Sequence, residues 1–542
     1  MDYIKRNYLK ILAFLSILVI AFSFNNLSLW DQDEAAYAGF AERMIATGNW
    51  LVPDYMWSFI HRKTPLHFWN IAISYKIFGI NEFAVRFPST LSIIGIYLMI
   101  YFWGARLFGK RVATIASLVL ATTLFVPSLG KISVTDATLM MFTTLSAFSI
   151  LQVLDNKSWK AVAVFWIAFS MALITKGPPI IIFTSIFIFI LFVLHPKRKN
   201  LFRLHPWFFL PIAVAPLFIW GYLASQSDGG VFIDWLIDWY ILKRISGSVL
   251  GQTGAPGLHL LFTFVFFIPY FMFFPKALWN GISGIWNDKG ERFLLGAWFV
   301  AGWLIWEFSP SKLPAYTVAA QVPLAILIAK IAVKQIDDKS RSHKALIISH
   351  FVLLMLLSIG LTVASFFLEM DVVLKSSFIA LVILMIIGIV IFAKRLYSDH
   401  FMKILIGINL VFQFMLWVVL MPQVDNYKNS TKLVGEYIAN NAPENSAVII
   451  GNVTGHPPSL VYYASFSSDN ITEDQDIEDL IAAYESDKPT VLILTYEQSQ
   501  QLLEKYPNAK VKSFISFFVD RKGKAGYYVI VNVLRYTQDD NV

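Results

Sequence analysis

The chain has 542 residues, of which 57% are hydrophobic and 15% charged, whereas a soluble domain is nearer half apolar and a quarter charged, so the composition indicates a membrane protein. It contains no cysteine, which excludes disulfides, thiolate metal sites and cysteine nucleophiles. The formal charge of +8 does not indicate nucleic-acid binding, because membrane proteins collect Lys and Arg in their inner loops.

Apolar runs long enough to cross a bilayer recur along the first 421 residues. A spanning helix needs about 17–25 predominantly apolar residues, and about thirteen runs meet this requirement. They lie near residues 9–24, 87–105, 112–129, 137–154, 160–175, 179–195, 207–223, 258–275, 293–308, 314–332, 346–368, 374–393 and 401–421. The predicted fold is therefore mainly α, a polytopic membrane protein.

The basic residues gather in alternate loops. With the N-terminus inside, the inner segments carry more than half of the 44 Lys and Arg residues, as the positive-inside rule requires. An odd number of spans then places residues 422–542 outside.

Two outer segments have their own structure. In the first outer loop, Glu34–Thr47 and Pro65–Phe78 suit helices lying along the membrane interface. In the tail, a short helix is predicted at Leu433–Ala439 and two buried strands at Ala447–Gly451 and Thr490–Thr495. A hairpin is predicted from Phe514–Val519 and Tyr527–Val533. The predicted domains are a transmembrane domain, 1–421, and a small α/β domain, 422–542.

Ionisable residues collect at the outer ends of the spans. Such residues are costly at membrane depth, so they tend to be paired or functional. Carboxylates beside cations suit a site that binds an anion and abstracts a proton. Asp33 or Glu34 is a candidate general base. The candidate phosphate-binding cations are Lys63, Lys176, Arg244 and Lys312.

All of these residues except Arg244 also have a structural explanation. The acidic ones, Asp31, Asp33 and Asp136, suit helix caps, and Glu34 is favourable in a first helical turn. The basic ones suit an interfacial anchor (Lys63), a turn between spans (Lys176) and a snorkelling lysine (Lys312). No HExxH or paired carboxylate–histidine spacing favours a metal site.

Several elements in order resemble one group of membrane glycosyltransferases. They are Asp33-Glu34-Ala-Ala-Tyr37-Ala with Gly48-Asn-Trp50, Arg62-Lys63-Thr64-Pro65-Leu66 with Trp69, Arg86-Phe-Pro-Ser, Thr135-Asp136, Thr175-Lys176-Gly177-Pro178, Gly254-Ala-Pro-Gly-Leu-His259 and Ser311-Lys312-Leu313-Pro314-Ala-Tyr316. This GT-C group contains the bacterial aminoarabinose transferases that modify lipid A, and is related to the protein O-mannosyltransferases.

The resemblance implies an inverting enzyme of the bacterial inner membrane, with a cytoplasmic N-terminus and a periplasmic C-terminal domain. Its expected partners are a polyprenyl-phosphate-linked sugar donor, a lipid (lipid A-like) or glycan acceptor, and membrane lipids. A protein O-glycosyltransferase of the same fold is one alternative. A lipid or glycan transporter is another, although no internal repeat is apparent.

The resemblance also assigns roles to residues. It makes Asp33 and Asp136 the catalytic acidic residues. The donor-phosphate ligands that it implies are Lys63, Tyr316 and Arg244. Lys312 and Lys176 are added to them as cations at the same ends of the spans, and the expected substrate-binding residues are Glu34 and Tyr37. Arg62 stands where aminoarabinose transferases have a glutamate associated with a metal ion, so a divalent metal is put in doubt and no other cofactor is expected.

Overall fold

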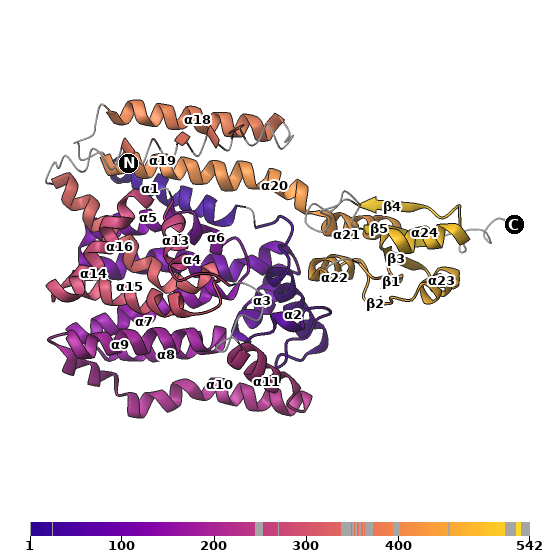
Figure 1. The fold of residues 1–542 in the computed structure, drawn as a ribbon, viewed down its shortest axis with the longest axis horizontal. Coiled ribbons are helices and arrows are strands. Elements are labelled where there is room, and N and C mark those ends of the chain that lie inside the picture. The colour runs from indigo at the N-terminus through magenta and orange to yellow at the C-terminus, as the bar shows by residue number, and fades with distance from the viewer. Residues whose placement is uncertain are drawn as a thin grey trace.

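The computed structural model describes residues 2–23, 25–243, 253–268, 270–337, 372–393, 401–453, 456–514 and 527–532, with short pieces between 348 and 363. Long helices run side by side and form a bundle (Figure 1), which we call the membrane body. Its helices are α1 (Asp2–Phe22), α4 (Glu82–Phe108), α5 (Lys110–Ala121), α6 (Phe125–Leu129), α7 (Thr135–Asp155), α8 (Trp159–Lys176), α9 (Pro178–Leu194), α10 (Pro206–Asp228), α13 (Leu258–Phe266), α14 (Phe274–Asn287), α15 (Glu291–Phe308), α16 (Val318–Asp337), α18 (Val372–Ala393) and α19 (Phe401–Phe414).

Six of the described helices are long and apolar enough to cross a membrane. They are Glu82–Phe108, Thr135–Asp155, Trp159–Lys176, Pro206–Asp228, Pro314–Lys334 and Ile406–Asp425, and shorter apolar helices cover Ala13–Phe22 and Pro178–Leu194. The prediction of a mainly helical polytopic protein is confirmed at this level. The predicted span at 346–368 lies largely outside the described residues.

The predicted span at 258–275 is wrong as a single helix. The structure has α13, a 3-10 turn at Phe271–Phe273 and then α14. The nine residues of α13 rise about 14 Å, less than half of a bilayer core of about 30 Å. Helix α14 instead packs closely on α15 where Gly281 meets Gly296. The approach is so close that a Cβ atom at Gly296 would come within 2.1 Å of the Gly281 carbonyl oxygen.

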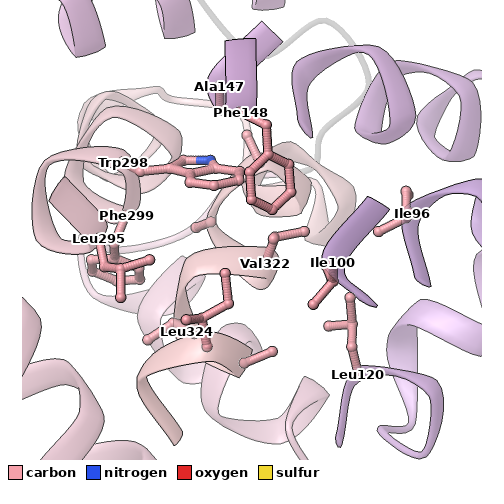
Figure 2. Close-up of a cluster of buried hydrophobic side chains, with 14 of the residues drawn as sticks. Ile96, Ile100, Leu120, Ala147, Phe148, Leu295, Trp298, Phe299, Val322 and Leu324 are labelled. Carbon is pink, nitrogen blue, oxygen red and sulfur yellow. The ribbon is translucent and has the colours of Figure 1, made fainter. Parts of the chain in front are cut away.

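The core of the membrane body lies where α4, α7, α15 and α16 meet (Figure 2). The fully buried Trp298 of α15 meets Phe148 of α7 edge to face, with ring centroids 5.3 Å apart. Ile96 and Ile100 of α4 and Val322 of α16 complete this contact layer. Close packing of these large side chains fixes the positions of the helix ends, and the candidate site residues lie at those ends.

A long loop, residues 25–81, precedes α4 and covers one end of the bundle, which we call the loop end. It contains α2 (Asp33–Thr47), the short η1 (Phe59–His61) and α3 (Leu66–Phe78). Both helices expected along the interface are therefore confirmed as helices. In Figure 1 they lie between the membrane body and the C-terminal strands.

The C-terminal unit, residues 430–532, is a mixed sheet with helices. Strands β1 (Ala447–Ile450), β2 (Ile471–Glu473) and β3 (Thr490–Leu494) are parallel, while β4 (Val511–Phe514) and β5 (Tyr527–Asn532) are antiparallel, in the order β2-β1-β3-β5-β4. Its helices are α21 (Ser430–Asn441), α22 (Pro458–Ser465), α23 (Ile477–Glu485) and α24 (Tyr496–Lys505). The predicted α/β character, both buried strands and the pairing of the hairpin are confirmed, although residues 515–526 lie outside the described residues.

The C-terminal unit is anchored to the long loop by Asp31. Its carboxylate accepts hydrogen bonds from the Ser459 backbone N–H at 3.0 Å and from the Ser459 hydroxyl at 2.5 Å, in the first turn of α22. The prediction that Asp31 caps the helix beginning near Ala35 is therefore wrong. The cap position of α2 is Gln32, which makes no side-chain cap bond. Asp31 instead accepts hydrogen bonds in the first turn of α22, a helix that is remote in sequence.

A buried glutamate lies in the same interface. Glu42 of α2 accepts a hydrogen bond from the Ser465 hydroxyl at 3.1 Å, and its second oxygen is buried without a partner among the described residues. Burial, with a contribution from nearby Asp469, raises the pKa of Glu42 from 4.5 to about 7. The folded protein therefore binds this proton more tightly than the unfolded chain does.

We expect the melting temperature to fall as pH rises from roughly 4.5 through 7, because the stability contributed by protonated Glu42 is lost across that window. Glu42→Gln mimics the neutral form and should flatten this part of the profile. Thermal unfolding of the purified protein between about pH 5 and pH 8 measures the effect. Asp54→Asn, an exposed carboxylate in the same loop, should keep the wild-type slope, and parallel profiles for wild type and Glu42→Gln would contradict the assignment.

Candidate active site

The first candidate residue, Asp33, opens α2 at the loop end of the membrane body. Its Oδ1 atom lies 2.7 Å from His61 Nδ1 and 3.7 Å from Lys63 Nζ, and about half of its side chain (51%) is exposed. The cap residue of α2 is Gln32, so capping does not account for Asp33. Asp33 is instead a solvent-accessible carboxylate fixed between a histidine and a lysine.

The electrostatics of this cluster keep Asp33 ionised. Partial burial raises the pKa of its carboxyl group, but Lys63, the hydrogen bond and charge of His61, and Lys176 together lower it by more. The pKa therefore lies well below its usual range, and the carboxylate stays negative at neutral pH. Lys176, which pairs with Asp136, is thus one of the cations that lower the pKa of Asp33.

Lys63 is buried and held in place by an aromatic side chain. Its Nζ atom donates to the Tyr37 hydroxyl and lies 4.6 Å from the centroid of the Tyr37 ring. Tyr37 itself is fully buried. The sequence places Tyr37 one helical turn after Asp33, so α2 presents the carboxylate and the tyrosine on one face. Tyr37, predicted to bind substrate, is positioned here to orient Lys63.

His67 was not identified from the sequence. It is fully buried in α3, its Nε2 atom lies 3.2 Å from the Ser133 hydroxyl, and its ring meets Tyr37 edge to face. Burial and nearby Lys63 lower its pKa to about 3, so it is neutral. The only sequence signal was its place two residues after Pro65 in the Lys63 motif.

A second acid–base pair comes from two other helices. Asp136, in the first turn of α7, accepts a hydrogen bond from Lys176 Nζ at 2.6 Å, and both side chains are about nine-tenths buried. The cap residue of α7 is Val134, so capping does not explain Asp136. Gly177, with a φ of 75°, ends α8 and lets α9 begin at Pro178, which places Lys176 opposite Asp136.

Glu34 does not occupy a substrate-binding position. It is 1% exposed, and its two oxygens accept paired hydrogen bonds from Arg86 Nε and Nη2, each 2.8 Å long. The backbone N–H groups of Trp30 and Ser133 donate to the same oxygens. The structure therefore corrects the substrate-binding assignment, because Glu34 is saturated inside the protein and joins the long loop to α4.

Lys312 belongs to a separate cluster. Its Nζ atom donates to the carbonyl oxygens of Trp306 and Glu307 at 3.0 and 2.7 Å, and it is 5% exposed. The Glu307 carboxylate in turn accepts from the backbone N–H groups of Gly257 and Leu260. Lys312 thus binds the last turn of α15, and Glu307 joins that turn to the start of α13. These contacts favour a structural role for Lys312 over direct phosphate binding.

Tyr316 lies beside this cluster, with its ring 4.7 Å from that of Trp306 and 5.9 Å from that of His259. It is half-buried, and its role as a phosphate ligand stays a prediction. Arg244, also predicted to bind the donor phosphate, lies outside the described residues.

The described residues do not form a metal site. No three of their His, Asp or Glu side chains gather as a metal ion would require. Arg62, which stands at the position of a metal-associated glutamate, pairs with Asp54 at 2.7 Å and lies over the Phe59 ring. A guanidinium at this position repels a cation.

The arrangement has a definite chemical capacity. An accessible carboxylate that is ionised at neutral pH lies beside the ammonium of Lys63, and the charge of Lys176 also acts on it. The carboxylate can accept a proton from a hydroxyl group. The ammonium groups can neutralise an anion that binds at the loop end of the membrane body.

Comparison with known proteins agrees with these motifs. Residues 62–221 match the family model described as dolichyl-phosphate-mannose-protein mannosyltransferase. The undecaprenyl phosphate-alpha-4-amino-4-deoxy-L-arabinose arabinosyl transferase 2 of Proteus mirabilis (strain HI4320) is 28% identical over 335 residues, which cover 60% of this chain and 59% of that protein. The corresponding transferase of Yersinia pestis (strain Pestoides F) is 25% identical over 342 residues, covering 61% and 60%. The match therefore spans about three-fifths of the length of these relatives.

Solved structures agree over nearly the whole chain. The structure of ArnT from Cupriavidus metallidurans bound to undecaprenyl phosphate superposes with a TM-score of 0.76 and 17% identity, covering 98% of this chain and 99% of that one. Its apo state gives a TM-score of 0.73, with 96% and 97% covered. At this identity the likeness concerns the fold alone. The chain is therefore similar in sequence to the aminoarabinose transferases of these bacteria and similar in fold to the ArnT structures.

Proposed function

We propose that this protein is a membrane glycosyltransferase that moves a sugar, with inversion, from a polyprenyl-phosphate donor to a lipid (lipid A-like) or glycan acceptor. The observation that carries the proposal is the ionised, accessible Asp33 carboxylate beside Lys63 at one end of the membrane body. Relatives described as undecaprenyl phosphate-alpha-4-amino-4-deoxy-L-arabinose arabinosyl transferases support the choice of a polyprenyl-phosphate-linked sugar as donor.

In the proposed reaction the acceptor hydroxyl oxygen attacks the anomeric carbon as the bond from that carbon to the phosphate oxygen breaks. The hydroxyl proton passes to Asp33, and the electron pair leaves with the polyprenyl phosphate. The ammonium groups of Lys63 and of Lys176, which Asp136 holds in place, stabilise the developing phosphate charge. Donor phosphate beside Lys63 also competes for its charge, which raises the basicity of Asp33 when it must accept the proton.

The proposed function also specifies the membrane arrangement. About thirteen spans place residues 1–421 in the bacterial inner membrane with a cytoplasmic N-terminus. Residues 422–542 form a periplasmic domain, and the loop end faces the periplasm. The donor, whose polyprenyl chain lies in the bilayer, then presents its phosphate to Lys63 at the interface.

A protein O-glycosyltransferase is the second candidate, because the description of the family model that matches residues 62–221 names a protein mannosyltransferase. Both candidates use the same carboxylate and the same phosphate-neutralising lysines. They differ only in the acceptor that reaches Asp33.

Mass spectrometry of a strain lacking this protein tests the proposal. We expect one sugar-modified envelope lipid or glycan to disappear and to return with the wild-type gene but not with Asp33→Asn. Loss of sugar from proteins with unchanged lipids and glycans would favour the second candidate. Unchanged lipids, glycans and glycoproteins would contradict both.

A further inference from the structure

A cavity of about 340 Å³ lies at the end of the membrane body opposite the loop end. It is lined by the C-terminal turns of α4 and α7, the segment after α9 and the first turn of α15. Helix α7 carries Asp136 at its other end, and α15 ends shortly before Lys312. Because these two helices have 21 and 18 residues, the cavity lies roughly 30 Å from the candidate active site.

The lining of the cavity has a surplus of positive charge. Its cations are Arg106, Lys197 and Lys289, and its carboxylates are Asp155 and Glu291. Both carboxylates are already neutralised: Lys197 Nζ lies 2.8 Å from Asp155, and Lys330 pairs with Glu291.

Two cations therefore remain for an anion. Lys289 Nζ makes one long hydrogen bond of 3.4 Å to the Leu194 carbonyl oxygen. Arg106 is exposed and makes no hydrogen bond or ion pair with any other residue that the structure describes. A guanidinium and an ammonium converging on one cavity match the oxygens of a phosphate group.

Apart from the buried His195, whose Nδ1 atom accepts a hydrogen bond from the Lys197 backbone N–H, the rest of the lining is mainly apolar. Leu107, Phe108, Leu151, Leu154 and Leu294 lie beneath the charged rim. The cavity therefore combines cations with buried apolar surface at the ends of packed helices. This combination suits the phosphate and glycerol of a lipid headgroup whose chains run along the helices. A freely soluble anion would gain nothing from the leucine floor.

We propose that this cavity binds the phosphate group of an anionic phospholipid from the leaflet opposite the candidate active site. Arg106 and Lys289 bind the phosphate, and the leucine-rich floor contacts the glycerol and the first carbons of the chains. The bound lipid bridges the ends of α4 and α15. This binding is independent of the sugar-transfer reaction.

The test is a titration of the full-length protein in detergent, with bound lipid counted by native mass spectrometry. The probes are phosphatidylglycerol, zwitterionic phosphatidylcholine and water-soluble glycerol 3-phosphate. The double variant Arg106→Gln/Lys289→Gln should weaken phosphatidylglycerol binding roughly ten- to thirty-fold, the effect of losing two cations at an anionic headgroup. Lys157→Gln/Lys160→Gln, which removes one exposed cation from the α7–α8 connection and one from the first turn of α8, both outside the cavity, should bind like wild type.

Three outcomes would overturn the proposal. One is equal loss of phosphatidylglycerol binding in both double variants, which would indicate a general charge effect. Another is equally tight binding of phosphatidylcholine. The third is binding of glycerol 3-phosphate as tight as that of the lipid, which would assign the cavity to a soluble phosphate. Both double variants change exposed side chains, so their melting temperatures should match wild type in the absence of lipid.

Discussion

Asp33→Asn is expected to lower sugar transfer by roughly a hundred- to ten-thousand-fold, the contribution typical of a general base. Asparagine has nearly the same shape and can still contact His61, but it cannot accept the proton from an acceptor hydroxyl. Donor binding should stay near the wild-type level, because Lys63 and the Asp136–Lys176 pair remain. Transfer rates from a polyprenyl-phosphate sugar and a separate titration with polyprenyl phosphate measure the two effects.

Two further variants make this result specific. Asp54→Asn removes a mostly exposed carboxylate from the same loop and should leave transfer unchanged. Lys63→Ala should weaken binding of polyprenyl phosphate, because it removes the cation beside Asp33. Full transfer by Asp33→Asn would show that Asp33 is not the base, whereas unchanged binding by Lys63→Ala would remove that lysine from the phosphate site.

Arg86→Leu is expected to cost about 3–5 kcal/mol of stability, because it leaves Glu34 charged and unpaired in the protein interior. Both side chains are completely inaccessible to solvent. Arg86 also donates to the carbonyl oxygens of Leu27 and Ser28, so its loss leaves these groups unsatisfied as well. Thermal unfolding of the purified protein in detergent should show a large drop in melting temperature.

The matched control is Arg292→Leu, which removes the same side chain from an exposed pair with Asp288. Such surface pairs contribute about 0–1 kcal/mol, so its melting temperature should stay close to wild type. Arg86→Lys should fall between the two, because one ammonium cannot replace the paired contacts with Glu34. Similar melting temperatures for Arg86→Leu and Arg292→Leu would contradict a structural role for the buried pair.

Local patterns were sufficient to predict much of the fold. The aromatic and amphipathic stretches of the long loop became α2 and α3 within one residue of their predicted starts. The strands Ala447–Ile450 and Thr490–Leu494 were visible as short buried apolar runs. Strand β2 was missed, because its three residues alternate too briefly to show a pattern. The break after α13 was missed because the sequence remains apolar through Phe273.

The candidate site was predictable only in part. Asp33 and Lys63 stand thirty residues apart, and motif order pointed to both of them. Partners from distant elements were invisible, so nothing local distinguished the fully paired Glu34 from its accessible neighbour Asp33. In the same way Lys312 resembled a phosphate ligand until its contacts with backbone carbonyls were seen.

The contact of Asp31 with α22 has a consequence for engineering this protein. Asp31 lies two residues before Asp33, so the C-terminal unit is attached next to the candidate base. Tyr463 strengthens the attachment by accepting from the Leu29 backbone N–H at 2.8 Å and donating to Glu82. A chimera that takes its C-terminal unit from a relative must therefore keep Ser459 and Tyr463, or exchange the long loop with it. Otherwise the replacement would leave the backbone around Asp33 without its outer support.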